Sequence, residues 1–136
     1  MLFRSLNKKN DLTVIDYQDM KQGPIGIDLA GILIDHYYEV DTSNIKELLN
    51  HYSNLMKSKY SESDLFEFLR WGCIQRNLRI LGTLSNLYLT KKRSFRLKDL
   101  PMILNNLIAM IPGDHESTEF MKNKVKPALV ERISEL

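Results

Sequence analysis

The feature that most constrains the fold is a long stretch, residues 63–92, with a helical repeat of apolar side chains. Its apolar residues recur every three or four positions, as on one face of an α-helix, and include Phe66, Leu69, Cys73, Leu78, Leu81 and Leu84. The pattern lasts for about seven turns, so one long helix is expected here. Ser61 or Ser63 is its expected N-cap, and Gly72 and Gly82 are expected to mark close packing against other helices.

Sequence patterns predict helices for most of the remaining chain as well. Residues 27–40 are apolar on nearly every side, which indicates a deeply buried helix that begins near Ile27. Thr42 or Ser43 should cap a helix over 44–57, whose apolar face would hold Ile45, Leu48, Leu49, Tyr52, Leu55 and Met56. A further helix is expected over 97–111, with Pro101 tolerated near its start and Pro112-Gly113 ending it. Residues 116–136 predict a weaker amphipathic segment.

One convincing strand, Leu12 to Ile15, precedes these helices. Residues 3–7 are either its hairpin partner or a loop that leads to it. The predicted fold class is therefore mainly α with one short β-hairpin, in a single domain with the hairpin in 1–20 and the helices in 24–136. Because an isolated hairpin is marginally stable, it must pack onto the helices, and the composition is typical of the second half of a larger fold.

Composition and charge exclude several classes of protein. Apolar residues make up 43% of the chain, charged residues 26%, and the net charge is +2, too small to indicate nucleic-acid or membrane-surface binding. No run of eighteen apolar residues predicts a membrane span, and the N-terminus lacks a secretory apolar segment. Cys73, the single cysteine, is predicted to be a buried apolar residue and fits a reducing cytoplasm. His36 and His51 have no partner histidine or cysteine at zinc-ligand spacing, and His115, after Gly113-Asp114, is expected in a surface turn.

The segment VIDYQDMKQGPIGIDLAGIL, residues 14–33, resembles the metal-binding segment of the aminoglycoside and choline phosphotransferases, which are small-molecule kinases with a protein-kinase-like fold. Ile15-Asp16-Tyr17 and the stretch from Gly23 to Ala30 match two parts of that family's signature. Gln18-Asp19, Arg70-Trp71, residues 74–89 and residues 97–107 look like the cell-wall amino-sugar kinases, which act on N-acetylmuramate and N-acetylglucosamine. The resemblance covers nearly the whole chain but only the C-terminal lobe of the family's α+β fold.

The resemblance implies roles for particular residues. Asp16 and Asn7 would hold the Mg²⁺ of Mg²⁺–ATP, since phosphoryl transfer needs its charge neutralised by metal bound to hard oxygen ligands. Asp28 would be structural, at the start of its helix and behind the catalytic loop. Substrate-binding residues would be Gln18, Asp19, Gln75 and Arg76.

Each of these residues could instead have a purely structural role. Asp16 at the end of a strand would also suit an Asx turn, and Asn7 is ordinary near a turn. Trp71 is expected to pack in or near the core, and charged residues around it usually form a solvated helix face.

The chain departs from the family where transfer chemistry is expected. Leu2 falls at the position of the catalytic aspartate, and a leucine can neither accept a proton nor orient a hydroxyl group. The nucleotide-binding lobe is also missing, so we expect the chain alone to be inactive, and binding of Mg²⁺ or ATP by it is not expected. Three alternatives stay open: a truncated or decayed kinase gene, a C-lobe completed by a separate N-lobe polypeptide, or a non-catalytic helical binding module. We also expect exposed apolar surface where the N-lobe would dock, and hence aggregation or dimerisation.

Overall fold

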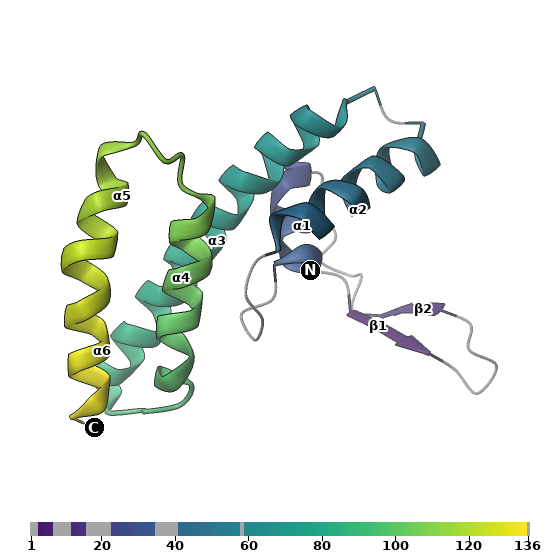
Figure 1. The fold of residues 1–136 in the computed structure, drawn as a ribbon. Helices are drawn as coiled ribbons and strands as arrows, with labels where there is room; N and C mark the ends of the chain where they lie inside the picture. The colour runs from purple at the N-terminus through teal and green to yellow at the C-terminus, as the bar shows by residue number, and fades with distance from the viewer. Residues whose placement is uncertain (1–2, 7–11, 16–22, 35–40, 58, 136) are drawn as a thin grey trace.

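The computed structural model describes residues 3–6, 12–15, 23–34, 41–57 and 59–135, and the structural statements below concern these residues. Strands β1 (Phe3–Leu6) and β2 (Leu12–Ile15) pair antiparallel, with Phe3 opposite Ile15 and Leu6 opposite Leu12. The rest of the described chain is mostly helical, which confirms the prediction of a mainly helical protein. Helix α3 (Glu62–Lys91) runs through the middle, with α1 and α2 beside its first half and α4 to α6 beside its second half (Figure 1).

Helix α3 starts at a capping box. The amide of Asp64 donates to Ser61 Oγ at 3.2 Å, and the amide of Ser61 donates to Asp64 Oδ2 at 3.0 Å. Each residue thereby satisfies a backbone N–H that the first helical turn leaves without a partner. Of the two predicted caps, Ser61 is therefore the one used, and the 30-residue length of α3 confirms the predicted long helix.

The capping box gives the start of α3 a dependence on pH. Hydrogen bonds from the Ser61 side chain and backbone lower the pKa of the Asp64 carboxyl below its usual value. Because the folded-state pKa is the lower one, the stabilisation is present above the unfolded pKa and is lost as pH falls through the folded value. We expect hydrogen-exchange protection of the amides in the first turn of α3 to decrease as pH falls below about 4. Asp64→Ala should remove this dependence, Asp114→Asn should keep it, and equal profiles for all three proteins would contradict the assignment.

Helices α1 (Ile25–Leu33) and α2 (Thr42–Leu55) pack against the first half of α3. They form the first core cluster, whose buried residues are Leu29, Ala30, Ile34, Ile45, Leu49, Leu65, Leu69, Cys73 and Met110. The prediction of a deeply buried helix in this region holds for Leu29 and Ala30 but is wrong for Ile32, which is 57% exposed. Helix α1 has its main neighbour, α3, on one side only, so its opposite face meets solvent.

The cap of α2 also differs from the prediction. Asp41 Oδ1 accepts from the amides of Ser43 and Asn44 at 3.0 and 3.2 Å, so Asp41 is the N-cap and the helix begins at Thr42. Three members of the predicted apolar face, Leu48, Leu55 and Met56, are exposed because α2 buries only a narrow stripe against α3.

One core position of α3 is polar. Asn77 is buried one turn after Cys73, and its Nδ2 lies 3.2 Å from Cys73 Sγ as a hydrogen-bond donor. Leu78, which the apolar pattern assigned to the buried face, is 46% exposed instead. The prediction for Leu78 is wrong because at this turn of α3 Asn77, and not Leu78, occupies the buried face.

The second half of α3 packs on α4 (Leu100–Met110), which follows a 3₁₀ turn, η1 (Leu97–Asp99). The second core cluster consists of Leu84, Leu97, Leu100 and Ile103. Pro101 lies in the first turn of α4 and Pro112 follows its end, as predicted. Met110, at the end of α4, belongs to the first cluster, so α3 and α4 both join the two clusters.

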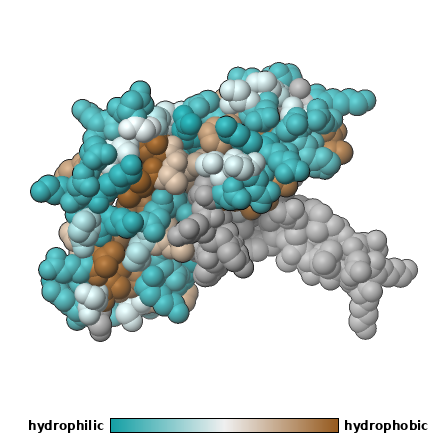
Figure 2. All heavy atoms as spheres, in the orientation of Figure 1, coloured by the Kyte–Doolittle hydropathy of each residue, from teal (hydrophilic) through white to brown (hydrophobic). Residues whose placement is uncertain are grey.

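Apolar side chains also remain on the surface. Leu89, Phe95, Phe120 and Val130 are exposed, and brown patches interrupt the hydrophilic surface over the region of α4 to α6 (Figure 2). The expectation of exposed apolar surface at the docking site of a missing lobe stays a prediction. None of the helices in the described residues combines the length and the apolar character needed to cross a membrane.

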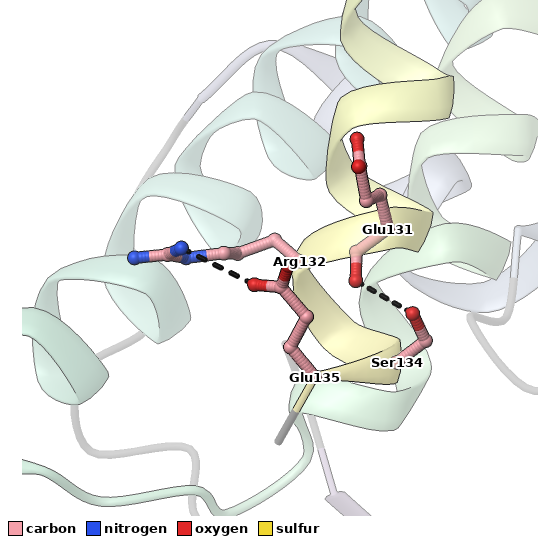
Figure 3. Close-up of polar contacts among 4 residues, drawn as sticks. All are labelled: Glu131, Arg132, Ser134 and Glu135. Atoms are coloured by element: carbon pink, nitrogen blue, oxygen red, sulfur yellow. Dashed lines mark hydrogen bonds and ion pairs between the residues drawn. The ribbon is translucent and has the colours of Figure 1, made fainter.

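The C-terminal segment is a nearly continuous helix in three parts, α5 (Glu116–Phe120), the π-helical η2 (Met121–Val125) and α6 (Lys126–Ser134). Pro127 follows the π turn, and such turns accommodate a residue that cannot donate its backbone N–H to the preceding turn. Leu129 and Ile133 pack against the second cluster. The last turn carries the ion pair Arg132–Glu135 at 3.3 Å, and Ser134 Oγ donates to the Glu131 carbonyl at 2.7 Å (Figure 3).

Candidate functional site

A pocket of about 610 Å³ lies between the start of α1 and the first half of α3. Its described lining consists of residues 23–27 and of Tyr60, Phe68, Trp71, Gly72 and Gln75. Ligand pockets for small molecules fall in a range of roughly 300–1,000 Å³, so a sugar-sized molecule fits this volume.

Two glycines bring the walls of the pocket together. A Cβ atom at Gly26 would overlap the Phe68 carbonyl group, and one at Gly72 would overlap the Gly26 carbonyl group. The backbones of α1 and α3 therefore touch directly at this crossing. Gly72 confirms the predicted close packing, whereas Gly82 has open space around its Cβ position and does not.

Aromatic side chains form the α3 side of the pocket. The rings of Tyr60 and Phe68 meet edge to face with centroids 5.1 Å apart, an arrangement that fixes both rings. Trp71 is 55% exposed, so the prediction that it packs in or near the core is wrong. It lies one turn after Phe68 on α3, on the side of the helix that turns away from the first cluster toward the pocket.

The polar groups in the described lining are the carboxamide of Gln75, the hydroxyl group of Tyr60 and the indole N–H of Trp71, and no Asp, Glu, Lys or Arg from the described residues lines the pocket. Arg76, predicted beside Gln75 as a substrate ligand, is directed elsewhere. Its Nη1 donates to the Ile34 carbonyl at 3.3 Å, where it supports the end of α1. Consecutive residues of a helix point about 100° apart, so the structure separates these two predicted residues.

Asn7, Asp16, Gln18, Asp19 and Leu2 lie outside the described residues, and the roles assigned to them stay predictions. Asp28 is exposed in the first turn of α1, where a negative charge is favourable. Pro24, the N-cap residue of α1, makes no side-chain hydrogen bond to the first turn of the helix.

Cys73, His51 and His115, the other potentially reactive side chains among the described residues, do not line the pocket. Burial raises the pKa of the Cys73 thiol to about 12, against a smaller opposite effect of Arg76, so this thiol stays protonated at neutral pH. His51 is exposed, and His115 caps α5 by accepting from the Ser117 amide at 3.2 Å. In the described part of the chain, no group of three or more His, Cys, Asp or Glu side chains is placed to hold a metal ion.

Sequence reasoning missed Tyr60, Phe68 and Gly26 as parts of the site. The signal for Gly26 was present: it follows Gly23-Pro24 at the start of a helix, where a third small residue allows close approach of a second helix. Tyr60 and Phe68 gave no signal, since aromatic residues near a helix start are most often core residues.

The chain is similar to part of a known sugar kinase. The chain is 25% identical over 99 residues to the N-acetylmuramate/N-acetylglucosamine kinase of Neisseria meningitidis serogroup B (strain ATCC BAA-335 / MC58). The match covers 69% of this chain but only 30% of the length of that kinase. No protein-family model matches the chain, and no solved structure matches it.

Proposed function

We propose that the chain is the C-terminal part of an ATP-dependent phosphotransferase for amino sugars of the N-acetylmuramate and N-acetylglucosamine type. The pocket carries this proposal. It lies where the Gly23–Ile27 segment meets Trp71 and Gln75. The first segment resembles the signature of the aminoglycoside and choline phosphotransferases, and the other two residues belong to stretches that resemble the amino-sugar kinases. The similarity to the meningococcal kinase supports the same class of substrate.

In this proposal the pocket binds the sugar, and Gln18, Asp19 and Gln75 contact it. Asp16 and Asn7 are the proposed Mg²⁺ ligands, because carboxylate and amide oxygens are the hard ligands that Mg²⁺ prefers. The metal would neutralise charge on the triphosphate of ATP. Leu2 falls at the position of the catalytic aspartate and can act neither as acid nor as base, so in this proposal the chain by itself binds the sugar without transferring phosphate.

The fluorescence of Trp71 tests the proposal directly, since it is the only tryptophan of the chain and lies at the pocket. N-acetylglucosamine and N-acetylmuramate should change its emission in a saturable way, with dissociation constants in the millimolar range, on the order of 4 kcal/mol of binding free energy. Incubation with ATP and Mg²⁺ should give no sugar phosphate. Failure of both sugars to saturate the signal, checked by calorimetry, would refute sugar binding, and measurable turnover would refute the role assigned to Leu2.

The exposed apolar residues Leu89, Phe95 and Phe120 favour a second candidate, a C-lobe that docks onto a separate N-lobe polypeptide. In this case the purified chain should self-associate or aggregate. Sedimentation analysis decides the matter, because a well-behaved monomer over a wide concentration range would count against a missing partner.

A further inference from the structure

We infer that a basic segment, residues 89–98, where α3 ends and the chain turns toward α4, binds the surface of an anionic phospholipid membrane. The inference goes beyond the proposed function, because this segment is separate from the pocket. Lys91, the last residue of α3, lies ~28 Å along the helix from Gly72 in the pocket wall, at 1.5 Å per residue. Figure 1 shows the connection from α3 to α4 at the end of the molecule where the C-terminus also lies, away from β1 and β2.

Positive charge is concentrated in the basic segment. Its sequence holds no acidic residue and five cationic ones, which are Lys91, Lys92, Arg93, Arg96 and Lys98. Arg96 Nε is paired with Asp99 Oδ2 at 2.7 Å, whereas the other four cations are exposed. The whole chain carries only +2, so the rest of it is slightly acidic and its net charge gave no sign of this segment. A cluster of this size attracts the anionic headgroups of a membrane surface.

A large apolar side chain lies among these cations. Phe95 is 71% exposed, more than any other large apolar side chain of the described residues, and Leu89 near the end of α3 is 68% exposed. Where basic and apolar side chains occur together, the apolar ones enter the boundary between headgroups and acyl chains while the basic ones meet the headgroups. A lipid surface therefore satisfies both the charge and the apolar surface of the segment.

The backbone holds Phe95 at the tip of a tight turn. The Leu97 amide donates to the Ser94 carbonyl at 3.1 Å, and Arg96 has a left-handed backbone conformation with a φ of 62°. Leu97 is buried in the second core cluster, so it anchors the turn to the helices while the ring of Phe95 stays in solvent. The ring is thus presented to a partner without a cost for ordering the loop on binding.

The composition of the segment distinguishes a lipid surface from other partners. The core of a protein interface is depleted of lysine, so a docked N-lobe polypeptide suits this segment less well than it suits the exposed Phe120 of α5. Single-stranded nucleic acid binds along successive aromatic rings, whereas the second exposed apolar side chain here is the aliphatic Leu89. The dipole of α3 favours Lys91 and Lys92 at its C-terminal end but does not account for Lys98.

Sedimentation with vesicles tests the inference on the whole chain. The protein should bind vesicles of equimolar phosphatidylcholine and phosphatidylglycerol, and high salt should abolish binding because it screens the attraction. Vesicles of phosphatidylcholine alone should bind at least about tenfold more weakly. Arg93→Gln combined with Lys98→Gln should weaken binding to the mixed vesicles about thirtyfold, because two cations are lost. Phe95→Ser should weaken it about tenfold, because the apolar ring is lost.

The matched control for charge is Lys122→Gln combined with Lys124→Gln, which removes the same charge from exposed lysines of η2. The matched control for apolar surface is Phe120→Ser on α5. Both controls should bind the mixed vesicles as the wild type does. Circular dichroism checks that every variant keeps its helix content.

The position of the ring has a readout of its own. Trp71→Phe combined with Phe95→Trp places the only tryptophan of the chain in the turn, and its emission should shift to the blue when the mixed vesicles are added. An unshifted emission would overturn insertion of the ring into the lipid.

Absence of vesicle binding, equal binding to the two kinds of vesicle, or equal losses in the basic-segment and control variants would overturn the inference. Binding of polyuridylate RNA without binding of vesicles would also overturn it and would identify a nucleic acid as the partner. None of these outcomes depends on the sugars, so a failure of sugar binding refutes the proposed function alone.

Discussion

Replacing Gly72 with alanine is expected to lower the free energy of unfolding by about 3 kcal/mol or more, a large part of the stability of a domain of this size. The new Cβ would overlap the carbonyl group of Gly26, and this neighbour is backbone, so no side-chain rotation relieves the overlap. Gly26→Ala meets the Phe68 carbonyl group in the same way. Helices α1 and α3 would have to separate, which opens the first core cluster and the pocket together.

Two other glycines provide matched controls on the same helices. Gly31 in α1 and Gly82 in α3 have no atom within 4 Å of the added Cβ. Alanine there should be neutral or should stabilise the protein by up to about 1 kcal/mol, because alanine has the higher helix propensity. Urea unfolding of the four variants measures the difference. Similar midpoints for Gly72→Ala and Gly82→Ala would show that the helices do not touch at this crossing.

Because Gly26 and Gly72 share one contact, their effects should not add. The double variant should lose clearly less than the sum of the two single losses, since the first alanine already separates the helices. Full additivity would indicate that the two glycines act at independent sites.

The long helices were predictable because their signals are local. The cap at Ser61, the repeat of apolar residues through α3, and the prolines at both ends of α4 lie within a few residues of the structure they determine. Burial was less predictable, because it depends on which face meets another helix. The exposure of Ile32, Leu48 and Leu78 follows from the one-sided packing of α1 and α2 and from Asn77 in the core.

The candidate site was predictable only in part for the same reason. Gln75 was found through a resemblance, and its neighbour Arg76 was grouped with it although the helix directs the two side chains differently. Trp71 was assigned to packing because tryptophan in a helix is most often buried, and only the tertiary structure shows that it borders a pocket. Tyr60 and Phe68 join the site through the crossing of α1 over α3, which no local pattern encodes.

Ile103→Ala is expected to lower the free energy of unfolding by about 2–5 kcal/mol, since Ile103 is fully buried in the second core cluster. Leu89→Ala, on α3 and 68% exposed, is the control and should change stability by no more than about 0.5 kcal/mol. Chemical denaturation followed by far-UV circular dichroism measures both effects.

The fluorescence of Trp71 adds a second expectation. Trp71 lies on the half of α3 that carries the first cluster, whereas Ile103 lies on α4 in the second cluster. Helix α4 places Ile103 in the second cluster and Met110 in the first, so loss of the second cluster should also free Met110. Trp71 fluorescence and circular dichroism should therefore give the same midpoint in Ile103→Ala, shifted equally from the wild type. If the fluorescence kept its wild-type midpoint while helix content fell earlier, the pocket would belong to a unit that is stable without the C-terminal helices.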